Sequence, residues 1–525
     1  MTDGTGDGTD GTDGETADTG DAADTTGDVR DARPTGGRFS RRRMLALSAT
    51  GLLGSVAGCS GSGGDDTPTA EATPTDGATS TPTATAAPTD AQTPDPTATP
   101  TDESTATPTA TATPTFDTSY LDSSPSSSFA PTDGFGNADW LAERTDELQV
   151  LRVTNLDRSG EGSLRWAVNQ SGPRVVVFEV GGVIDLQGEH VITGGDNLYV
   201  AGQTAPSPGI TVIRGVVTVT GSNTIVQHIR VRPGDRLVEG PREGPPAPAG
   251  GAVDALTLDD EISNIVLDHN SASWGTDENM SVGMANDHVT HTNNLIAEGL
   301  SVTPVHEESE HSKATLVRPN ATAVSLIGNS YINNVDRNPR LNAGSEVAIV
   351  NSFVYNFDEA IELVGGEGNR VTATITRNYY RAGETTPAND PIVKPEQTGA
   401  RAFIAFNRTE PSTIPVVRES RNLENLQSRP VYPDGFQALP VAEVPEHNLA
   451  STGARPADRT PTDERLVSEA RTNEGDIIDS QDEVGGYPDL EETERALDPP
   501  EAGDGLAEWL HQHTRAVELP DASAP

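Results

Sequence analysis

The chain has 525 residues and a formal net charge of -45, from 80 acidic and 35 basic residues. So negative a surface repels other polyanions, which excludes nucleic acid as a general partner. The balance is typical of a protein adapted to concentrated salt, where screening over about 3 Å at 1 M makes dense like charge tolerable. A protein that is merely acidic is the alternative. Because composition shifts sharply along the chain, we expect one large folded domain.

Residues 1–59 are predicted to be an N-terminal extension that ends in an export signal. The segment "SRRRMLALSATGLLGSVAGC" places paired arginines before a short apolar run that ends at Cys59, the only cysteine. The arginines resemble a twin-arginine signal, and "VAGC" resembles the lipobox at which lipoproteins are cleaved and lipidated. We expect export by this route and lipidation of Cys59, which anchors the protein to the outer face of the cytoplasmic membrane. Soluble release or an ordinary buried thiol is the alternative.

Residues 60–145 are predicted to be a disordered linker. From Gly61 to about Thr115 the chain consists largely of threonine, proline, alanine and aspartate, with little apolar surface to bury. This composition favours an extended, O-glycosylated stalk. Such a stalk holds the following domain away from the membrane.

Short β-branched runs such as "RVVVFEV" and "ITVIRGVVTVTG" dominate from Val150 onward, and amphipathic helical stretches are nearly absent. An apolar strand that ends in asparagine recurs at intervals of roughly 22 to 35 residues, as in a stacked repeat. These asparagines are Asn270, Asn294, Asn329, Asn351, Asn378 and Asn407. Asparagine tolerates the left-handed conformation of a sharp corner, and stacked asparagines can hydrogen-bond between layers.

The pattern predicts an all-β fold, a right-handed parallel β-helix of about three strands per coil over residues 146–440. An antiparallel sandwich is the alternative, but two-residue hairpin turns are scarce between the strands. Residues 441–525 form an acidic C-terminal segment that we expect to pack partly on the β-helix.

Charged residues fall on neighbouring coils of this predicted β-helix. They are Asp254, then Asp277 and Glu278 about one coil later, and then Lys313, Arg337 and Arg340. With coils about 4.8 Å apart, these carboxylates and cations lie within a few sugar units of each other. Clustered carboxylates suit a hard cation such as Ca²⁺, and lysine and arginine suit an anionic substrate. Solvated surface carboxylates are the alternative.

Four motifs carry a family resemblance: "DALTL", "NIVLDHNSASWGTDEN", "HSKATLV" and "VDRNPRLN". In order and spacing they resemble the family 1 polysaccharide lyases, the pectate lyases, and the likeness extends from Val150 to about Asp489. It implies calcium-assisted β-elimination of α-1,4-linked polygalacturonate, which yields 4,5-unsaturated oligogalacturonides. The implied partner is therefore an acidic polysaccharide, and we expect the chain to act as a monomer.

The resemblance also implies residue roles. Arg337, the first arginine of the R-x-P-R phrase, matches the base that removes the C5 proton. Lys313 matches the lysine that binds a substrate carboxylate, and Asp254 and Asp277 match calcium ligands. The pKa of arginine is above about 12. A strongly alkaline optimum or a C5 proton acidified by calcium would each permit an arginine base.

Three positions depart from the family's pattern. Ser281 replaces a second acidic calcium ligand, and Ala252 stands where some members have another aspartate. Glu278 is expected to supply the missing oxygen. Where the family often has a second substrate-binding arginine, this chain has Asn342, and Arg340 is the expected replacement. A structural arginine in a salt bridge is the alternative for Arg340.

Several residues outside the charged row also carry predictions. His311, beside Lys313, is expected to line the groove and contact the substrate. Asp268 and His269 are expected to form a structural hydrogen-bonded pair, and Trp274 a packing residue, although an aromatic ring can also stack on a sugar. Glycosylation sequons occur at Asn169, Asn279, Asn320 and Asn407.

Three other functions compete with a lyase. A non-catalytic β-helix that binds acidic polysaccharide would explain the missing carboxylates. A galacturonan hydrolase would need two carboxylic acids that flank the scissile bond, whereas Asp277 and Glu278, side by side on a strand, should point to opposite faces. A pectin lyase, which acts on methyl esters without calcium, is disfavoured by the remaining carboxylates.

Overall fold

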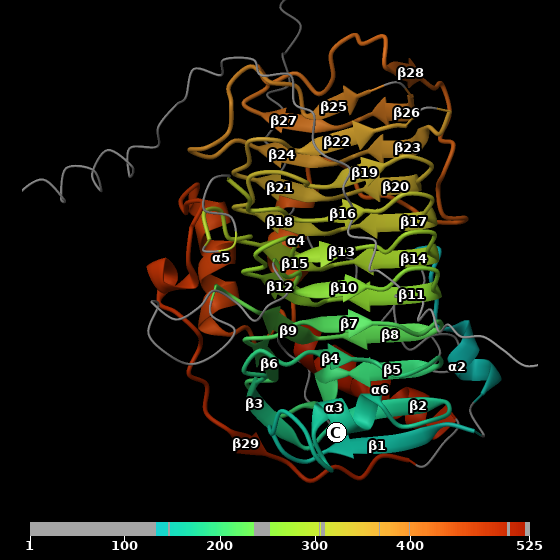
Figure 1. Ribbon diagram of the computed structural model, residues 1–525, viewed down its shortest axis with the longest axis vertical. Coiled ribbons are helices and arrows are strands. Elements are labelled where there is room, and N and C mark those ends of the chain that lie inside the picture. The colour runs from blue at the N-terminus through green and yellow to red at the C-terminus, as the bar shows by residue number, and fades with distance from the viewer. Residues whose placement is uncertain are drawn as a thin grey trace, which may run out of the picture. The chain divides into compact units, whose positions relative to one another are not determined.

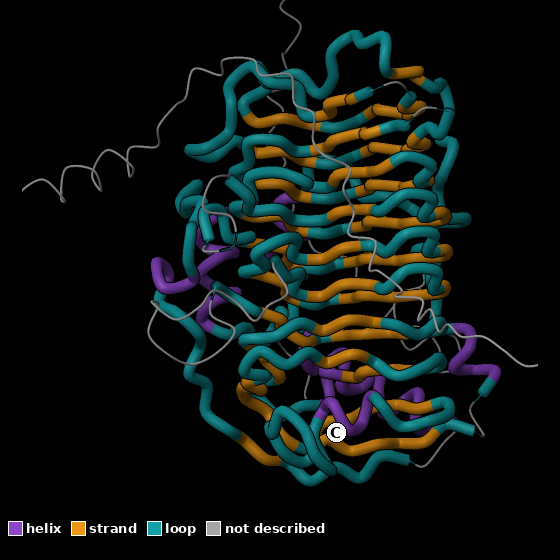
Figure 2. The backbone as a smooth tube through the Cα atoms, viewed as in Figure 1, coloured by secondary structure: helices purple, strands orange, loops and turns teal. Residues whose placement is uncertain are grey.

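The computed structural model describes residues 133–144, 147–235, 252–303, 305, 310–366, 368–397, 399–500 and 504–519. Within these ranges the predicted parallel β-helix is confirmed, because strands from Gln149 to Asn425 wind into stacked coils of three strands (Figure 1). Figure 2 shows the coils as parallel layers of strand joined by loops. The predicted export signal, the lipidation site at Cys59 and most of the predicted linker lie outside the described residues.

Wall A is an 11-stranded parallel sheet with one strand from each coil. Its strands, in spatial order, are β1 (Gln149–Val153), β2 (Arg174–Phe178), β5 (Leu198–Ala201), β8 (Thr224–Gln227), β11 (Ser263–Asp268), β14 (Asp287–Thr292), β17 (Thr322–Ile327), β20 (Glu346–Val350), β23 (Val371–Thr376), β26 (Ala400–Ala405) and β28 (Leu423–Asn425).

Wall B is a 10-stranded sheet in which every pair but one is parallel. Its strands are β3 (Val180–Asp185), β6 (Ile210–Ile213), β9 (Ile229–Arg232), β12 (Ser271–Ser273), β15 (Leu295–Ala297), β18 (Ser330–Ile332), β21 (Phe353–Tyr355), β24 (Tyr379–Arg381) and β27 (Arg408–Glu410). The antiparallel strand β29 (Thr493–Glu494) pairs with β3 at one edge, so the C-terminal segment extends this wall.

Wall C consists of two four-stranded parallel sheets. The first contains β4 (Val191–Ile192), β7 (Val217–Val219), β10 (Leu256–Leu258) and β13 (Met280–Ser281). The second contains β16 (Leu316–Val317), β19 (Arg340–Asn342), β22 (Ile361–Val364) and β25 (Val393–Glu396). A bridge between Val282 and Val317 joins the two halves, so wall C continues along the β-helix.

β-Branched and leucine side chains fill the interior in stacked rows. In wall A, Val289, Val324 and Val347 pair in register on three successive strands and are all fully buried. Every residue of β2, β5 and β8 is buried, so both faces of these parallel strands are covered, which accounts for the nearly continuous apolar runs in the sequence.

The recurring asparagines form a hydrogen-bonded ladder between coils. The backbone N–H and Nδ2 of Asn270 donate to Oδ1 of Asn294 at 2.9 and 3.3 Å. Asn294 donates to Asn329 in the same way, at 2.9 and 3.1 Å. The ladder residues are not the left-handed residues that we expected, because the residue before each takes that conformation. His269 has a φ of 51° and Asn293 a φ of 53°.

Asn351 is also not the rung that the pattern predicts. Ser352 occupies the ladder position, and its N–H donates to Oδ1 of Asn378 at 2.8 Å. Asn351 has a φ of 54° and is the left-handed corner residue that precedes it. The sequence pattern is therefore right about the ladder and wrong by one residue at this coil.

The described helices lie outside the three walls, although Leu164, Ala167 and Val168 belong to the apolar core of the β-helix. They are α2 (Asp139–Glu143), α3 (Leu164–Val168), α4 (Val444–Ser451), α5 (Pro461–Thr472) and α6 (Asp504–Glu518), with short 3-10 turns at Gly202–Thr204 and Gln481–Val484. Helices α4 and α5 pack on the outer face of wall B, where Leu466 and Val467 contact an apolar cluster that includes Phe353 and Tyr355. None of the helices in the described ranges combines the length and apolarity needed to span a bilayer.

Candidate active site

The six charged residues from the sequence analysis converge where the chain passes from wall B to wall C. Asp254 precedes β10, Asp277 and Glu278 precede β13, Lys313 precedes β16, and Arg337 precedes β19, which begins at Arg340. Glu278, Lys313 and Asp336 pair in register on three successive coils. Each coil therefore contributes its own charge to one continuous row.

Asp254, Asp277 and Glu278 point their carboxylates at one another. One oxygen from each lies within 4.8 Å of the other two. Asp277 and Glu278 belong to the turn before β13 rather than to a strand, so the expectation that they point to opposite faces is wrong. The Glu278 N–H donates to Oδ1 of Asp254 at 3.2 Å, and the Asp277 N–H donates to the Val253 carbonyl at 3.0 Å.

This carboxylate cluster fits a calcium ion. Burial, and then the charge of Asp277, raise the pKa of Asp254 to about 6, while the hydroxyls of Thr257 and Ser281 lower it. The repulsion that raises this pKa would be relieved by a cation. Carboxylate oxygens are the ligands that Ca²⁺ prefers. Ser281, the residue in place of a second acidic ligand, thus faces the cluster with a neutral oxygen.

Lys313 lies beside this cluster. Its Nζ is 2.8 Å from Nε2 of His311 and 3.9 Å from Oδ1 of Asp277. An ammonium group can only donate, so Nε2 of His311 accepts this hydrogen bond. The lysine side chain is 12 % exposed, so it is largely buried and its contacts fix its direction. His311 therefore orients Lys313, in addition to its expected place in the groove.

Arg337 forms an ion pair with Glu278 across the coil that carries Lys313. It has a φ of 58°, and its side chain is 16 % exposed. Burial, and then the charge of Arg340, lower the pKa of Arg337. Glu278 is thus both a member of the carboxylate cluster and the partner of the expected base, a relation that sequence spacing does not indicate.

Arg340 pairs with Glu362 on the next coil, with Nη1 3.2 Å from Oε2. Its Nε donates to Oδ1 of Asn342 at 3.4 Å. Burial, and then the charge of Asp336, raise the pKa of Glu362 to about 8. Glu362 was not predicted from the sequence, although its position one coil after Arg340 and in register with it was the available signal.

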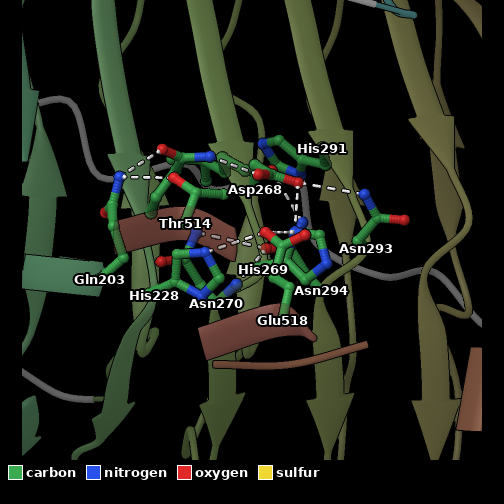
Figure 3. A network of polar contacts seen from close by, with 12 residues as sticks. Gln203, His228, Asp268, His269, Asn270, His291, Asn293, Asn294, Thr514 and Glu518 are labelled. Atoms are coloured by element: carbon green, nitrogen blue, oxygen red, sulfur yellow. Dashed lines mark hydrogen bonds and ion pairs between the residues drawn. The ribbon is translucent and has the colours of Figure 1, made fainter. Parts of the chain in front are cut away.

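A second cluster of titratable groups lies between wall A and helix α6 (Figure 3). His228 and His269 stack on successive coils with ring centroids 5.1 Å apart. Nε2 of His228 is 3.1 Å from Oε1 of Glu518, and Nδ1 of His269 is 2.8 Å from Oδ1 of Asp268. The Asp268–His269 pair is thus part of a larger network, and its contact with Glu518, 249 positions away from His269, gave no sequence signal.

Hydrogen bonding in this second cluster disfavours a metal ion. The backbone N–H of Arg455 donates to Nδ1 of His228 at 3.2 Å. A neutral imidazole that accepts at Nδ1 carries its proton on Nε2, so it donates to Glu518 and has no lone pair there for a metal. The cluster is complete as a hydrogen-bonded contact that attaches α6 to wall A.

The sequons differ in exposure. Asn279 is fully buried, and its Nδ2 donates to Oδ1 of Asn334 at 3.1 Å, so its side chain has no room for a glycan. Asn407 donates its Nδ2 to the Ile375 carbonyl as part of the asparagine ladder. Asn169 and Asn320 are exposed.

Comparisons with known proteins identify relatives of this chain. No protein-family model matches the chain. It is 29% identical over 391 residues to "Probable pectate lyase C" of Emericella nidulans, an alignment that covers 72% of this chain and 84% of the relative. It is 36% identical over 261 residues to the protein of the same name from Aspergillus flavus, which covers 49% of this chain and 55% of that relative. The chain thus spans about half the length of the latter.

Two solved structures are among those similar to this chain. A pectate lyase bound to a hexasaccharide has a TM-score of 0.45 and 13% identity, over 63% of this chain and 98% of that one. The major allergen from cedar pollen has a TM-score of 0.43 and 16% identity, over 60% of this chain and 91% of that one.

Proposed function

We infer that this chain is a member of the pectate lyase family, a polysaccharide lyase that cleaves α-1,4-linked polygalacturonate by β-elimination. The observation that carries this inference is the convergence of Asp254, Asp277 and Glu278 with Lys313, Arg337 and Arg340 on one edge of the β-helix. Two relatives that share 29% and 36% identity carry the name "Probable pectate lyase C".

Asp254, Asp277 and Glu278 would hold the calcium ion. When bound, Ca²⁺ would withdraw charge from a substrate carboxylate and make the neighbouring C5 hydrogen more acidic. Ser281 and Ala252 leave the site with three carboxylates of its own. The substrate carboxylate and water would complete the six to eight oxygens that calcium usually takes.

Lys313 and Arg340 bind the carboxylates of the polymer in this proposal. Lys313 is directed by His311 and by Asp277, so its ammonium group meets the substrate at a fixed place. Arg340 offers a planar guanidinium that can grip a carboxylate through two parallel hydrogen bonds. These cations supply the local positive charge that a polyanionic substrate needs near so acidic a chain.

Arg337 removes the C5 proton. Its partly buried position next to a second arginine lowers its pKa, which increases the fraction of neutral guanidine at alkaline pH. Transfer of the proton to Arg337 leaves an electron pair at C5. This pair forms the C4–C5 double bond as the C4–O4 bond breaks, and the departing O4 takes a proton from water.

The proposal includes the cellular location from the sequence. Export by the twin-arginine route and lipidation of Cys59 would place the enzyme outside the cell, either anchored to the membrane or released. Glycosylation would be restricted to the exposed sequons Asn169 and Asn320.

The test is the ultraviolet absorbance of unsaturated uronides. Purified protein is mixed with polygalacturonate in concentrated salt, over a wide pH range, with calcium or with a chelator. We expect a rise in absorbance that requires calcium and is greatest at alkaline pH. Binding of the polymer without any rise in absorbance would instead favour the non-catalytic polysaccharide-binding function, and a rise only with methyl-esterified pectin would favour a pectin lyase.

A further inference from the structure

Trp274 begins the turn that carries Asp277 and Glu278. It is the left-handed residue at the corner after β12, with a φ of 66°, and its side chain is fully buried. The backbone N–H of Trp274 donates to the Glu298 carbonyl at 3.0 Å. The position of this one residue therefore sets where the acidic turn leaves wall B.

Helix α5 holds Trp274 through a closed ring of side chains. The indole Nε1 donates to Oε2 of Glu298 at 3.0 Å, and Arg465 of α5 donates to both oxygens of Glu298 at 2.8 Å each. On the other side, the guanidinium of Arg232 lies over the indole, 5.5 Å from its centroid, and pairs with Asp463 of α5. Asp463 and Arg465, both on α5, thus hold Trp274 in place through Arg232 and Glu298.

Four of the five ring members are withdrawn from water, whereas the Arg465 side chain is 26 % exposed. Arg232 and Asp463 are fully buried, and Glu298 is 1 % exposed. Water does not compete for the hydrogen bonds of the buried charged groups, so these side chains orient one another. Tyr487 packs edge-on against Trp274 with centroids 6.1 Å apart, which adds a second contact from the C-terminal segment.

Hydrogen bonds connect the turn after Trp274 to the carboxylate cluster. The Gly275 N–H donates to Oδ1 of Asn279 at 2.9 Å, and the N–H groups of Thr276 and Asp277 both donate to the Val253 carbonyl. Val253 in turn donates to Oγ1 of Thr276 at 2.9 Å. The turn is therefore bound to the residue just before Asp254, and a shift at Trp274 moves both sides of the cluster.

We propose that the ring of Arg232, Trp274, Glu298, Asp463 and Arg465 is a positioning device by which helix α5 sets the calcium affinity of the acidic turn. These are positioning residues, since they act on the site through the turn. The part that concerns calcium rests on the proposed function. The C-terminal segment is thus a component of the site's scaffold.

The experiment compares two arginines of α5 in the full chain. Arg465→Met breaks the ring, whereas Arg471→Met removes an exposed arginine of the same helix that contacts Glu446 at 3.5 Å. We expect Arg465→Met to raise the calcium dissociation constant, measured by calorimetry, about tenfold. Maximal turnover should return when calcium is saturating, and Arg465→Lys, which retains a single donor group, should be intermediate. Arg471→Met should match the unmodified protein.

Hydrogen–deuterium exchange gives a readout that does not depend on calcium. In metal-free Arg465→Met, the amides of Thr276, Asp277 and Glu278 should exchange faster, with the amides of walls A and B unchanged. Glu298→Gln, which keeps the shape of the side chain, should do the same and serves if Arg465→Met does not fold.

Two results would overturn the inference. One is unchanged exchange at residues 276–278 in both folded variants, and the other is faster exchange spread over wall B, which would mean a merely structural role. If the unmodified protein neither binds calcium nor cleaves polygalacturonate, the proposed function fails, while the exchange data still decide whether α5 positions the turn.

Discussion

Arg337 and Glu278 form an ion pair that joins the expected base to the expected calcium site. Lys313 lies between them in the row of paired coils, because Glu278, Lys313 and Asp336 stand in register. An anionic partner favours the charged form of arginine. If Glu278 turns to a bound cation, Arg337 loses that partner and its pKa falls further. Cation binding and activation of the base are therefore linked through one carboxylate.

Replacement of Arg337 by alanine should reduce kcat by at least about 100-fold, the typical minimum contribution of a positioned proton acceptor. The initial rate of uronide absorbance at saturating substrate and calcium measures this. Arg340→Ala is the comparison variant: it should raise KM, and because it removes a charge that lowers the pKa of Arg337, it should also lower kcat, but far less than Arg337→Ala does. An Arg337→Ala protein with full activity would show that another residue is the base.

Ser281→Asp should strengthen calcium binding. The hydroxyl of Ser281 already faces Asp254, so an aspartate there adds a fourth carboxylate to the cluster. Without calcium this carboxylate adds repulsion and should lower the temperature of thermal unfolding. With calcium the protein should be stabilised more than the unmodified chain is, since a tenfold increase in affinity is worth about 1.4 kcal/mol.

Thermal unfolding with and without calcium measures both effects. Ser281→Asn, which has a similar size and no charge, is the control. An equal calcium response in the aspartate and asparagine variants would contradict the proposed position of the cation.

Substrate affinity should fall as the pH rises through about 8. Burial raises the pKa of Glu362 to about 8, so below this pH its carboxyl group is neutral and leaves Arg340 available to the substrate. Above this pH the ionised carboxylate pairs with Arg340 and repels the polymer. We expect KM to rise about tenfold across this range, the equivalent of one hydrogen bond to a charged group.

Glu362→Gln isolates the effect because its amide cannot ionise. Its KM should stay low and flat from pH 7 to pH 9. Arg340→Gln should show a high KM with the same flat profile. A KM that still rises in Glu362→Gln would mean that another group is responsible.

Acidification should loosen helix α6 through His228. Burial, and then the charges of His269, Arg455 and Arg230, lower the pKa of His228 well below its usual 6.5. The unfolded chain therefore binds a proton below pH 6.5 that the folded chain does not, and stability falls as the pH drops below that value. Each pH unit costs up to about 1.4 kcal/mol. Glu518 acts in the opposite sense, because burial raises its pKa and the folded state keeps its proton.

The measurement therefore uses Glu518→Gln as the background. In that background the temperature of thermal unfolding should fall more between pH 7.5 and pH 5.5 with His228 present than with His228→Asn. Asparagine is the suitable replacement because His228 has a φ of 57°. Equal pH dependence in the two proteins would exclude His228 as the group that titrates.

The sequence was sufficient for the fold and for the charged row because both follow from local repetition. Each β-branched run packs on the same kind of run one coil away, and asparagines at the same corner bond from coil to coil, as Asn294 does to Asn329. Asp254, Asp277 and Lys313 come together for the same reason. The direction of Glu278 could not be predicted, because the turn before β13 replaces the strand that the alternation of side chains assumes.

Contacts made by the C-terminal segment lay beyond sequence reasoning. Glu298 meets Arg465 across 167 positions, and His228 meets Glu518 across 290. No spacing rule connects residues on the coil with residues on helices that fold back over its outer face. Glu362 differs from these contacts, because it lies one coil after Arg340 and in register with it, so the repeat spacing was an available signal.

Each charge in the row comes from a different coil, and this affects how proteins of this fold can diverge. Glu278, Lys313 and Asp336 are supplied by three consecutive turns of the solenoid, each with its own backbone pairing. Duplication or loss of a single turn would shift one charge relative to the next by about 4.8 Å while every layer kept a neighbour to stack on. A change in the number of coils can thus alter the spacing of the charged side chains, and so suit the enzyme to polymers with a different spacing of acidic groups. No single coil needs to change its own sequence.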